Sequence, residues 1–557
     1  MAMENRTGDR TAPSFLDPLT TGRLDLERLG PFPCRDEASE QHADSAAERA
    51  VAFVSALVDA DEIDRTGRLP THLLADLASA GYFKLGCDRE IGGHGLSAHD
   101  IFRVIARVAR LSVPVGQILG FENGFCAAAL LPGLPNGPVR DFVLRRVREG
   151  VVSAFGVTEP AGQNNTWPTL TATLTEDGSA YLLRGEKLYA GNGPVAELVI
   201  TAATRWEDGA PRLATCFLDA DTPGFAVSAQ IEFLGFRGLP NGGWRFDDVR
   251  VPKDRVLLGP PGRPDPDLPI SSIKLLGQLY SAGAPALAII DNCLSWSREF
   301  VARRHIDGRN LGEYDQIQRI VAATVADAYA MDTVVRWCLL DSGMTDRAFE
   351  RLAAKNILSL SAWRTADRTM SLFGAEGLET IESKRRRGAV PTPVERCFRD
   401  ARGLRILGNV DFRIDDKITR QLLTRGFTVE SGPITRQPPA DPRLSPGNRG
   451  HLRTLAQQVR RFAETGAQHT HRLAEAQPDT RQQTAVTLGR IAGELFAMWA
   501  VLARTAEQAS WAGPMRTQDM ADAYCTAARH RLAECWRTME AESEPDYAAI
   551  SRQWLSN

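Results

Sequence analysis

Two short glycine-containing segments of this 557-residue chain carry residue types that can hold an anionic ligand. The first reads FGVTEPAG at positions 155–162, and the second reads GEKLYAGNG at positions 185–193. In the first, Pro160 and Gly162 favour a tight turn whose backbone N–H groups can face an anion. Taken alone, such a segment is more typical of an ordinary turn, so its meaning depends on the elements that position it.

The bulk composition excludes several classes of partner. It is that of a globular protein, with 43% hydrophobic and 24% charged residues. A formal net charge of -3 gives no electrostatic reason to expect nucleic acid or an anionic membrane as partner. No apolar run approaches the ~20 residues that span a bilayer, and the N-terminus lacks the apolar region of a secretory signal. The 9 cysteines form no CxxC pair and no metal-ligand spacing with histidine, which predicts reduced thiols, no metal and a cytoplasmic location.

Changes in sequence pattern divide the chain into five parts. Residues 1–45 are polar and are predicted to be disordered or extended. Residues 46–150 place apolar residues at helical spacing and predict an α domain. Residues 151–265 contain short β-rich runs separated by Asp-Gly and Asn-Gly pairs, which predict an antiparallel β domain. Long helical patterns over 266–430 predict an α-helical bundle, and residues 431–557 a further helical domain. The predicted fold is therefore mainly α with a middle antiparallel β domain.

Further motifs in this order resemble the acyl-CoA dehydrogenase family. The segments GFRG at 235–238 and FDDVRVP at 246–252 are similar to the strand pair that closes the family's β domain. LFGAEG at 372–377 and VERCFRDA at 394–401 resemble its glycine turn and its Arg-Asp segment. The resemblance covers residues 50 to 425, and the helical segment after Gly450 looks like the appended C-terminal domain of the longer members.

The resemblance implies that FAD binds where the β domain meets the helical bundle. In the family, the first segment holds the flavin pyrimidine and the pyrophosphate. In the second, an aromatic residue packs on the isoalloxazine ring and a hydroxyl bonds N5. Arg304 is implied to reach the pyrophosphate of a neighbouring subunit, a role that suits a guanidinium group, so a homodimer or homotetramer with shared sites is expected. The residues that the resemblance assigns to FAD are Phe155, Val157, Thr158, Gly162, Gln163, Tyr189, Gly191, Arg304, Gly374, Ala375 and Asn409.

The catalytic positions depart from the family pattern. The family's usual reaction removes an α-proton from an acyl thioester with a carboxylate base and passes a hydride to the flavin. In most members the base occupies the position that corresponds to Leu407 in this chain, and in others the position that corresponds to Gly277. Neither a leucine nor a glycine side chain can accept a proton. Gly191 stands where a threonine or serine hydroxyl is expected. Asp411 is the nearest acid and a candidate base; the alternative is a helix-start residue that offsets the helix dipole.

These features predict an FAD-dependent oxidoreductase that acts on an acyl thioester, bound to CoA or to a carrier protein, or on a related small molecule in bacterial specialised metabolism. A non-standard base is one mechanism, and an oxygenase reaction with a flavin reductase as partner is another. The basic run at 384–387 either contacts a phosphate or carrier protein or is a solvated loop. A non-catalytic binding or scaffold subunit is the alternative function. A nucleic-acid-associated flavoprotein is a minor one, because arginines and acids nearly balance after residue 431.

Overall fold

The computed structural model describes residues 13–162, 165–264, 268–343, 346–429, 441–474, 482–508, 516–540 and 545–556. Side chains are described for these residues except 268–272 and 471–474. The chain forms two compact units: unit 1 comprises Met1–Ala12 and Pro33–Val410, and unit 2 comprises Pro13–Phe32 and Asp411–Asn557.

The N-terminal residues contain helices, where the sequence predicted a disordered or extended segment. Asp36 caps the longest of them by accepting the backbone N–H of Ser39, and an alanine-rich face of that helix is buried. An amphipathic face built from alanines carries little hydrophobic signal, which is why composition alone pointed to disorder. The helices that begin within residues 13–45 are α1 (Leu16–Thr21), α2 (Leu26–Leu29) and α3 (Glu37–Leu57).

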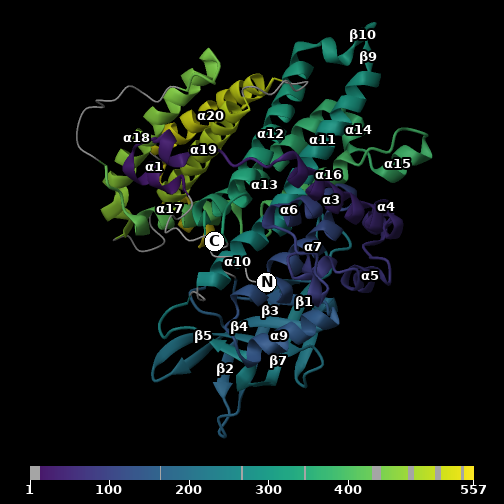
Figure 1. The fold of residues 1–557 in the computed structure, drawn as a ribbon, viewed down its shortest axis with the longest axis vertical. Helices are drawn as coiled ribbons and strands as arrows, with labels where there is room; N and C mark the ends of the chain where they lie inside the picture. The colour runs from purple at the N-terminus through teal and green to yellow at the C-terminus, as the bar shows by residue number, and fades with distance from the viewer. Residues whose placement is uncertain are drawn as a thin grey trace. The chain divides into compact units, whose positions relative to one another are not determined.

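Short helices complete the first half of unit 1, as the sequence predicted (Figure 1). Helix α7 is buried along its whole length and packs on α6 and on the first helices of the bundle. These helices are α4 (Ala60–Thr66), α5 (Leu73–Ser79), α6 (Ala98–Leu111), α7 (Val113–Gly124), α8 (Ala127–Leu130) and α9 (Pro138–Glu149).

Eight strands form one sheet with the order β6-β7-β3-β2-β4-β5-β8, and β1 pairs with β4. The sheet is mixed: β1 and β2 both run parallel to β4, and the prediction of a purely antiparallel domain was wrong in this respect. The 41 positions between the ends of β1 and the start of β4 are long enough for the crossover that a parallel pair needs. The strands are β1 (Ser153–Gly156), β2 (Thr171–Leu174), β3 (Ala180–Gly191), β4 (Leu198–Glu207), β5 (Ala210–Asp219), β6 (Phe225–Gln230), β7 (Asn241–Pro252) and β8 (Val256–Leu258).

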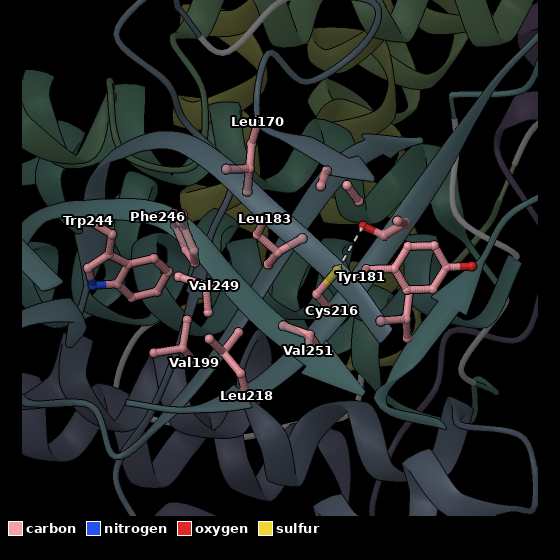
Figure 2. Close-up of a cluster of buried hydrophobic side chains, with 14 of the residues drawn as sticks. Leu170, Tyr181, Leu183, Val199, Cys216, Leu218, Trp244, Phe246, Val249 and Val251 are labelled. Carbon is pink, nitrogen blue, oxygen red and sulfur yellow. Dashed lines mark hydrogen bonds between the residues drawn. The ribbon is translucent and has the colours of Figure 1, made fainter. Parts of the chain in front are cut away.

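The core of this sheet lies directly beneath the two predicted flavin segments. Figure 2 shows Trp244 and Phe246 among the aliphatic side chains that fill one face of the sheet. The ring of Trp244 leaves no room for a side chain at Gly156, and its indole N–H donates to the carbonyl of Gly193 at 3.1 Å. One core residue therefore supports the start of the first segment and the end of the second.

Long helices of unit 1 follow the sheet. Helix α11 packs on α6, α12 and α13, and a π-helical turn, η6, joins it to α10. A small hairpin, β9 (His305–Ile306) and β10 (Arg309–Asn310), leaves the end of α11. The helices are α10 (Leu268–Gln278), η6 (Leu279–Gly283), α11 (Ala284–Arg303), α12 (Asp315–Leu339), α13 (Ala348–Phe373), α14 (Ala375–Leu378), α15 (Ile381–Arg386) and α16 (Val394–Leu404).

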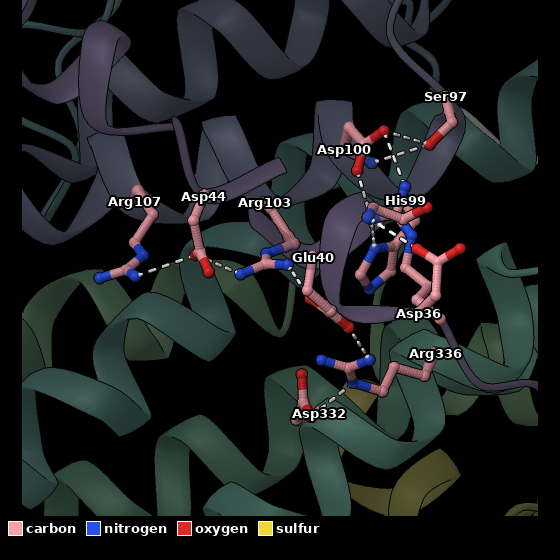
Figure 3. Close-up of polar contacts among 12 residues, drawn as sticks. Asp36, Glu40, Asp44, Ser97, His99, Asp100, Arg103, Arg107, Asp332 and Arg336 are labelled. Carbon is pink, nitrogen blue, oxygen red and sulfur yellow. Dashed lines mark hydrogen bonds and ion pairs between the residues drawn. The ribbon is translucent and has the colours of Figure 1, made fainter. Parts of the chain in front are cut away.

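An ion-pair network fastens α3 to α6 and α12 (Figure 3). Glu40 on α3 pairs with Arg103 on α6 and, at 2.6 Å, with Arg336 on α12. Asp44 also pairs with Arg103. Because Arg103 and Arg336 are largely buried, these pairs are less screened than exposed ones and fix the position of α3.

The C-terminal part of unit 2 begins at α17, twenty residues before the boundary that the sequence predicted at 430/431. The apolar face of α17 is buried, and Gly489 of α19 lets its backbone approach Asp415 closely. The apolar residues of α17 show that one face of the helix is buried, but they do not show which helix covers that face. The sequence therefore assigned α17 to the preceding bundle. The further helices of unit 2 are α17 (Asp411–Arg425), α18 (Pro446–Ala474), α19 (Gln482–Glu507), α20 (Thr517–Met539) and α21 (Tyr547–Leu555).

Two helical stretches, Ile273–Arg303 and Gln482–Glu507, are long and apolar enough to cross a membrane by length and composition alone. Their most apolar windows are 78% and 89% buried within the protein, as is usual for core helices.

Candidate functional site

A buried ion pair joins the two predicted flavin segments. Glu159, which follows β1, and Lys187, in the middle of β3, are 2% and 0% exposed, and the Lys187 Nζ lies 2.7 Å from the Glu159 Oε1. Glu159 also accepts the backbone N–H groups of Thr169 and Leu170. Burial alone would raise the pKa of Glu159, but these hydrogen bonds and that of Lys187 hold it below its ordinary value. The carboxylate is thus ionised and fixes both segments.

The first segment presents its backbone at the end of β1. Phe155, Val157 and Thr158 are half-buried, and the Thr158 carbonyl accepts the N–H of Leu188 from the second segment at 2.8 Å. Gly162 is exposed and has a φ of +108°, with no heavy atom within 4 Å of the position a Cβ would take. Gln163 lies outside the described residues.

The second segment turns Tyr189 outward at a bulge in β3. The pairing of β3 with β7 shifts register between Lys187 and Ala190, and Tyr189 takes a φ of +57°. Its ring is 55% exposed and stacks against Phe233 with centroids 6.3 Å apart. A large aromatic residue held outward in a left-handed conformation presents a free face for a planar ligand.

Gly191 has no room for the hydroxyl side chain that the family pattern expects. A Cβ at this position would lie 2.5 Å from Cε2 of Phe121, which projects from α7. The phenyl ring therefore occupies the volume of the missing threonine or serine. The glycine at position 191 and the phenylalanine at position 121 therefore depend on each other, because the Phe121 ring fits only where residue 191 has no side chain.

The Gly191→Thr variant should consequently be unstable, by about 1–3 kcal/mol in the free energy of urea unfolding, because the new side chain overpacks against Phe121. Adding Phe121→Ala should recover most of that loss by providing space. If Gly191→Thr alone unfolds at the wild-type urea concentration, the ring does not block the position.

The two positions where the family places its base meet in this structure. The Gln278 side chain, next to Gly277, donates from Nε2 to the carbonyl of Gly408 at 2.6 Å, and Gly408 directly follows Leu407. The backbone of Gly277 packs so closely on Gly124 of α7 that a Cβ would lie 2.4 Å from its carbonyl oxygen. Any side chain at position 277 would therefore meet the backbone of another helix.

A buried lysine donates hydrogen bonds to the backbone of the turn that follows α16. Lys355 of α13 donates to the carbonyls of Asn409 at 2.8 Å and Arg405 at 3.3 Å. Asn409 is buried with a φ of +103°, and Leu407 is half-buried. Asp411 is the first residue of α17, and its carboxylate accepts the N–H of Phe412, so the helix-start interpretation matches its position.

Arg304, Gly374 and Ala375 lie together, away from the segments just described. Arg304 caps the C-terminus of α11, and its guanidinium lies 3.6 Å from Glu376. Glu376 lies in the first turn of α14, which begins at Ala375 directly after Gly374. Gly374 has a φ of +59° and open space where a Cβ would point. Within unit 1, β9, β10 and α14 lie at the opposite end of the long helices from the sheet (Figure 1). One chain therefore does not bring Arg304 to Thr158 or Tyr189.

Most cations of the basic run at 384–387, on and just after α15, form hydrogen bonds or ion pairs with other residues of this chain. Lys384 is buried and donates to a backbone carbonyl at 2.5 Å. Arg385 pairs with Asp61, and Arg387 pairs with Glu379 at 2.5 Å. Three of its four cations thus have structural partners in the described part of the chain.

Three sequence profiles match the chain in the order expected: the N-terminal domain of acyl-CoA dehydrogenases at residues 39–133, the middle domain at 154–249 and the C-terminal domain at 280–410. Together they cover more than half of the chain. The chain belongs to the acyl-CoA dehydrogenase family.

Relatives and solved structures agree with this assignment. "Probable acyl-CoA dehydrogenase FadE10" of Mycobacterium tuberculosis is 31% identical over 430 residues, which is 76% of this chain and 65% of the relative, so the chain spans somewhat less than two thirds of that protein. Isobutyryl-CoA dehydrogenase of Dictyostelium discoideum is 24% identical over 65% of this chain and 84% of its own length. The Bacillus anthracis acyl-CoA dehydrogenase complexed with FAD superposes with a TM-score of 0.70 at 17% identity, over 97% of this chain and 94% of the other.

Measured against an acyl-CoA dehydrogenase flavin site, most residues present fit the cofactor. The open backbone at Gly162 and Gly374, the outward face of Tyr189 and the half-exposed Arg304 suit a dinucleotide. The Oδ1 atom of Asn192, beside Gly191, is buried without a hydrogen-bond partner among the described residues. The departure is at Gly191, where Phe121 replaces a hydroxyl.

Sequence reasoning missed the residues that support the site. Glu159 and Lys187 stood inside the quoted segments, and a lysine in mid-strand was the available signal. Phe121 and Glu122 lie on α7, and an acid inside an otherwise apolar helix was the signal for the second. Only contacts between distant segments assign these residues to the site.

Proposed function

We propose that this chain is an FAD-dependent oxidoreductase that acts on an acyl thioester of CoA or a carrier protein, or on a related small molecule, in specialised metabolism. Family membership and the paired segments around the Glu159–Lys187 ion pair support the cofactor. Bound oxidised flavin supplies a hydride acceptor. The nine cysteines are all free thiols, which is in keeping with a reaction in the cytoplasm.

The single observation that carries the choice of mechanism is the filling of the base position. The backbone of Gly124 leaves no room for a side chain at position 277, and the neighbouring Gln278 bonds the carbonyl of Gly408, next to Leu407. These are the two positions at which the family resemblance expects a glutamate. The amide of Gln278 cannot take up the substrate proton, so dehydrogenation here uses a base from elsewhere, or the reaction is of the oxygenase type. Asp411, at the start of α17, is the acid to be tested as that base. In the oxygenase case no carboxylate base is required and reduced flavin comes from a reductase. A non-catalytic subunit is the second candidate, favoured by the same observation.

The cofactor site is proposed to need a second copy of the chain. Arg304 and Gly374 have the residue types for a pyrophosphate, yet they lie at the far end of unit 1 from Thr158 and Tyr189. A homodimer or homotetramer would complete each site with the Arg304 end of another subunit.

The test begins with purified protein, which should be yellow or take up FAD on reconstitution. It is then mixed without oxygen with acyl-CoA and acyl-carrier thioesters, and bleaching of the visible flavin band reports dehydrogenation. We expect Asp411→Asn to bleach at the wild-type rate, because that carboxylate serves the start of α17. A loss of about 10²–10⁴-fold would instead identify Asp411 as the base.

Each remaining outcome separates the candidates. Oxygen uptake that requires an added flavin reductase, without anaerobic bleaching, supports the oxygenase mechanism. Bound flavin that neither bleaches nor supports oxygen uptake supports the non-catalytic subunit. Protein that cannot be reconstituted with FAD contradicts the proposal.

A further inference from the structure

A buried acid on α7 is hydrogen-bonded to the start of β1, the strand that leads into the first flavin segment, and to the second flavin segment. Glu122 is 1% exposed and accepts three hydrogen bonds. Two come from Ser153 at the start of β1, from its N–H at 2.9 Å and its hydroxyl at 2.7 Å. The third comes from Nδ2 of Asn192 at 3.1 Å. Asn192 follows Gly191 in the second flavin segment, and Ser153 begins β1, which leads into the first segment two residues later, so one carboxyl group links α7 to this strand and to the second segment.

The neighbouring residue on α7 contacts the same segment. Phe121 abuts Gly191 and Glu122 bonds Asn192, so two consecutive side chains of one helix fix two consecutive residues of the segment. Asn192 itself has a φ of +60°, in the left-handed region that asparagine adopts more readily than most residues. The Asn192 Nδ2 atom faces the carboxyl group, and its Oδ1 atom is buried and lacks a partner among the described residues.

The charged groups around Glu122 do not neutralise it. Burial raises its pKa to about 8, and the bonds from Ser153 and Asn192 oppose that rise only in part. Glu197, an exposed acid that precedes β4, raises the pKa further. Cys126 is the other titratable neighbour, and burial raises the pKa of its thiol well above the ordinary value, so it is neutral. Within the part of the chain that the structure describes, Glu122 forms no ion pair with a lysine, arginine or histidine.

We propose that Glu122 is a positioning residue for the flavin segments, and that loss of its proton weakens their grip on the cofactor. When neutral, the carboxyl group links Ser153 and Asn192 at no electrostatic cost and can donate to a neighbouring acceptor. When ionised, it places an uncompensated negative charge beneath a site built for an anionic dinucleotide. This inference rests on the proposed FAD cofactor and deepens it by adding a proton-dependent element.

The test compares FAD binding in the wild type and in Glu122→Gln, a neutral analogue of the protonated acid. The dissociation constant is measured by quenching of FAD fluorescence from about two pH units below to about two units above the Glu122 pKa. We expect the wild-type affinity to fall by about tenfold across this range, the contribution of one buried charge near an anion, while Glu122→Gln stays level. Ser153→Ala removes a donor that favours the ionised form and should move the midpoint to higher pH.

A matched control is Asp291→Asn on α11. Burial also raises the pKa of this acid, to about 6, but its charged neighbours are Arg110, Arg107 and Asp332, and it bonds neither flavin segment. Its variant should keep the wild-type profile. Parallel profiles for the wild type and Glu122→Gln would overturn the proposal.

Unfolding of the apo-protein separates this failure from failure of the proposed function. Because the folded pKa of Glu122 lies above the unfolded value of ~4.3, the wild type should lose stability relative to Glu122→Gln as pH rises from there to about 8, and no further above it. A flat difference contradicts the assigned titration whether or not FAD binds.

Discussion

Replacing Lys187 with methionine is expected to lower the free energy of unfolding by about 3–5 kcal/mol, because it leaves the Glu159 carboxylate buried without its cation. Both side chains are almost completely inaccessible, so no solvent replaces the lost ammonium group. Chemical denaturation followed by circular dichroism measures the loss. FAD binding should weaken as well, since the pair is what ties the first flavin segment to the second.

The double variant Lys187→Met/Glu159→Gln is the control for this ion pair. It removes both charges and keeps one acceptor oxygen, which can serve the N–H of Thr169 or of Leu170 but not both, because these bond different oxygens of Glu159. It should therefore recover a large part, but not all, of the stability. If it is as unstable as the single variant, the loss comes from packing and not from an unpaired charge.

Acid should erase the difference between the wild type and Lys187→Met. The pKa of Glu159 is lowered in the folded protein, so its stabilisation is complete above the unfolded value of ~4.3 and disappears as pH falls through the folded pKa. The two proteins should therefore approach each other in stability below about pH 4. A difference that persists unchanged in acid would contradict an electrostatic origin.

Restoring an acid with Gly277→Glu should destabilise the protein and should not create a dehydrogenase. The new Cβ would meet the carbonyl oxygen of Gly124 at 2.4 Å and the ring of Phe125 at 2.7 Å. Overpacking of this kind costs about 1–3 kcal/mol, and a buried, unpaired carboxylate adds to it. Because one obstacle is backbone, no second side-chain substitution removes it. The thermal midpoint and the anaerobic bleaching rate are the two measurements.

Two glycine-to-alanine variants serve as controls for the steric effect expected of Gly277→Glu. Gly277→Ala isolates the steric part and should still be destabilised. Gly450→Ala, in the helix α18 with its nearest neighbouring atom 3.8 Å from the new Cβ, should be stabilised by roughly 0.5–1 kcal/mol through helix propensity. A Gly277→Glu protein with the wild-type midpoint would show that α7 can move away from α10.

The sequence by itself determined the order of domains, the change from helical to strand periodicity near residue 151 and the membership of the acyl-CoA dehydrogenase family. These features are local: periodicity, turn residues and short motifs are each written within a few consecutive positions. For the same reason, Thr158, Tyr189 and Arg304 are candidates for the flavin site on the basis of short motifs alone.

The tertiary structure decided which distant residues share a place. The parallel pairing of β1 with β4, the transfer of α17 to unit 2, the Glu159–Lys187 pair and the Phe121 ring against Gly191 all join segments far apart in the chain. A single sequence holds no record of such pairings, because the energy of a buried contact depends on both partners and on the backbone between them. For the same reason, the sequence indicated only that Gly277 lacks an acidic side chain, whereas the structure shows that α10 crosses α7 closely at this residue.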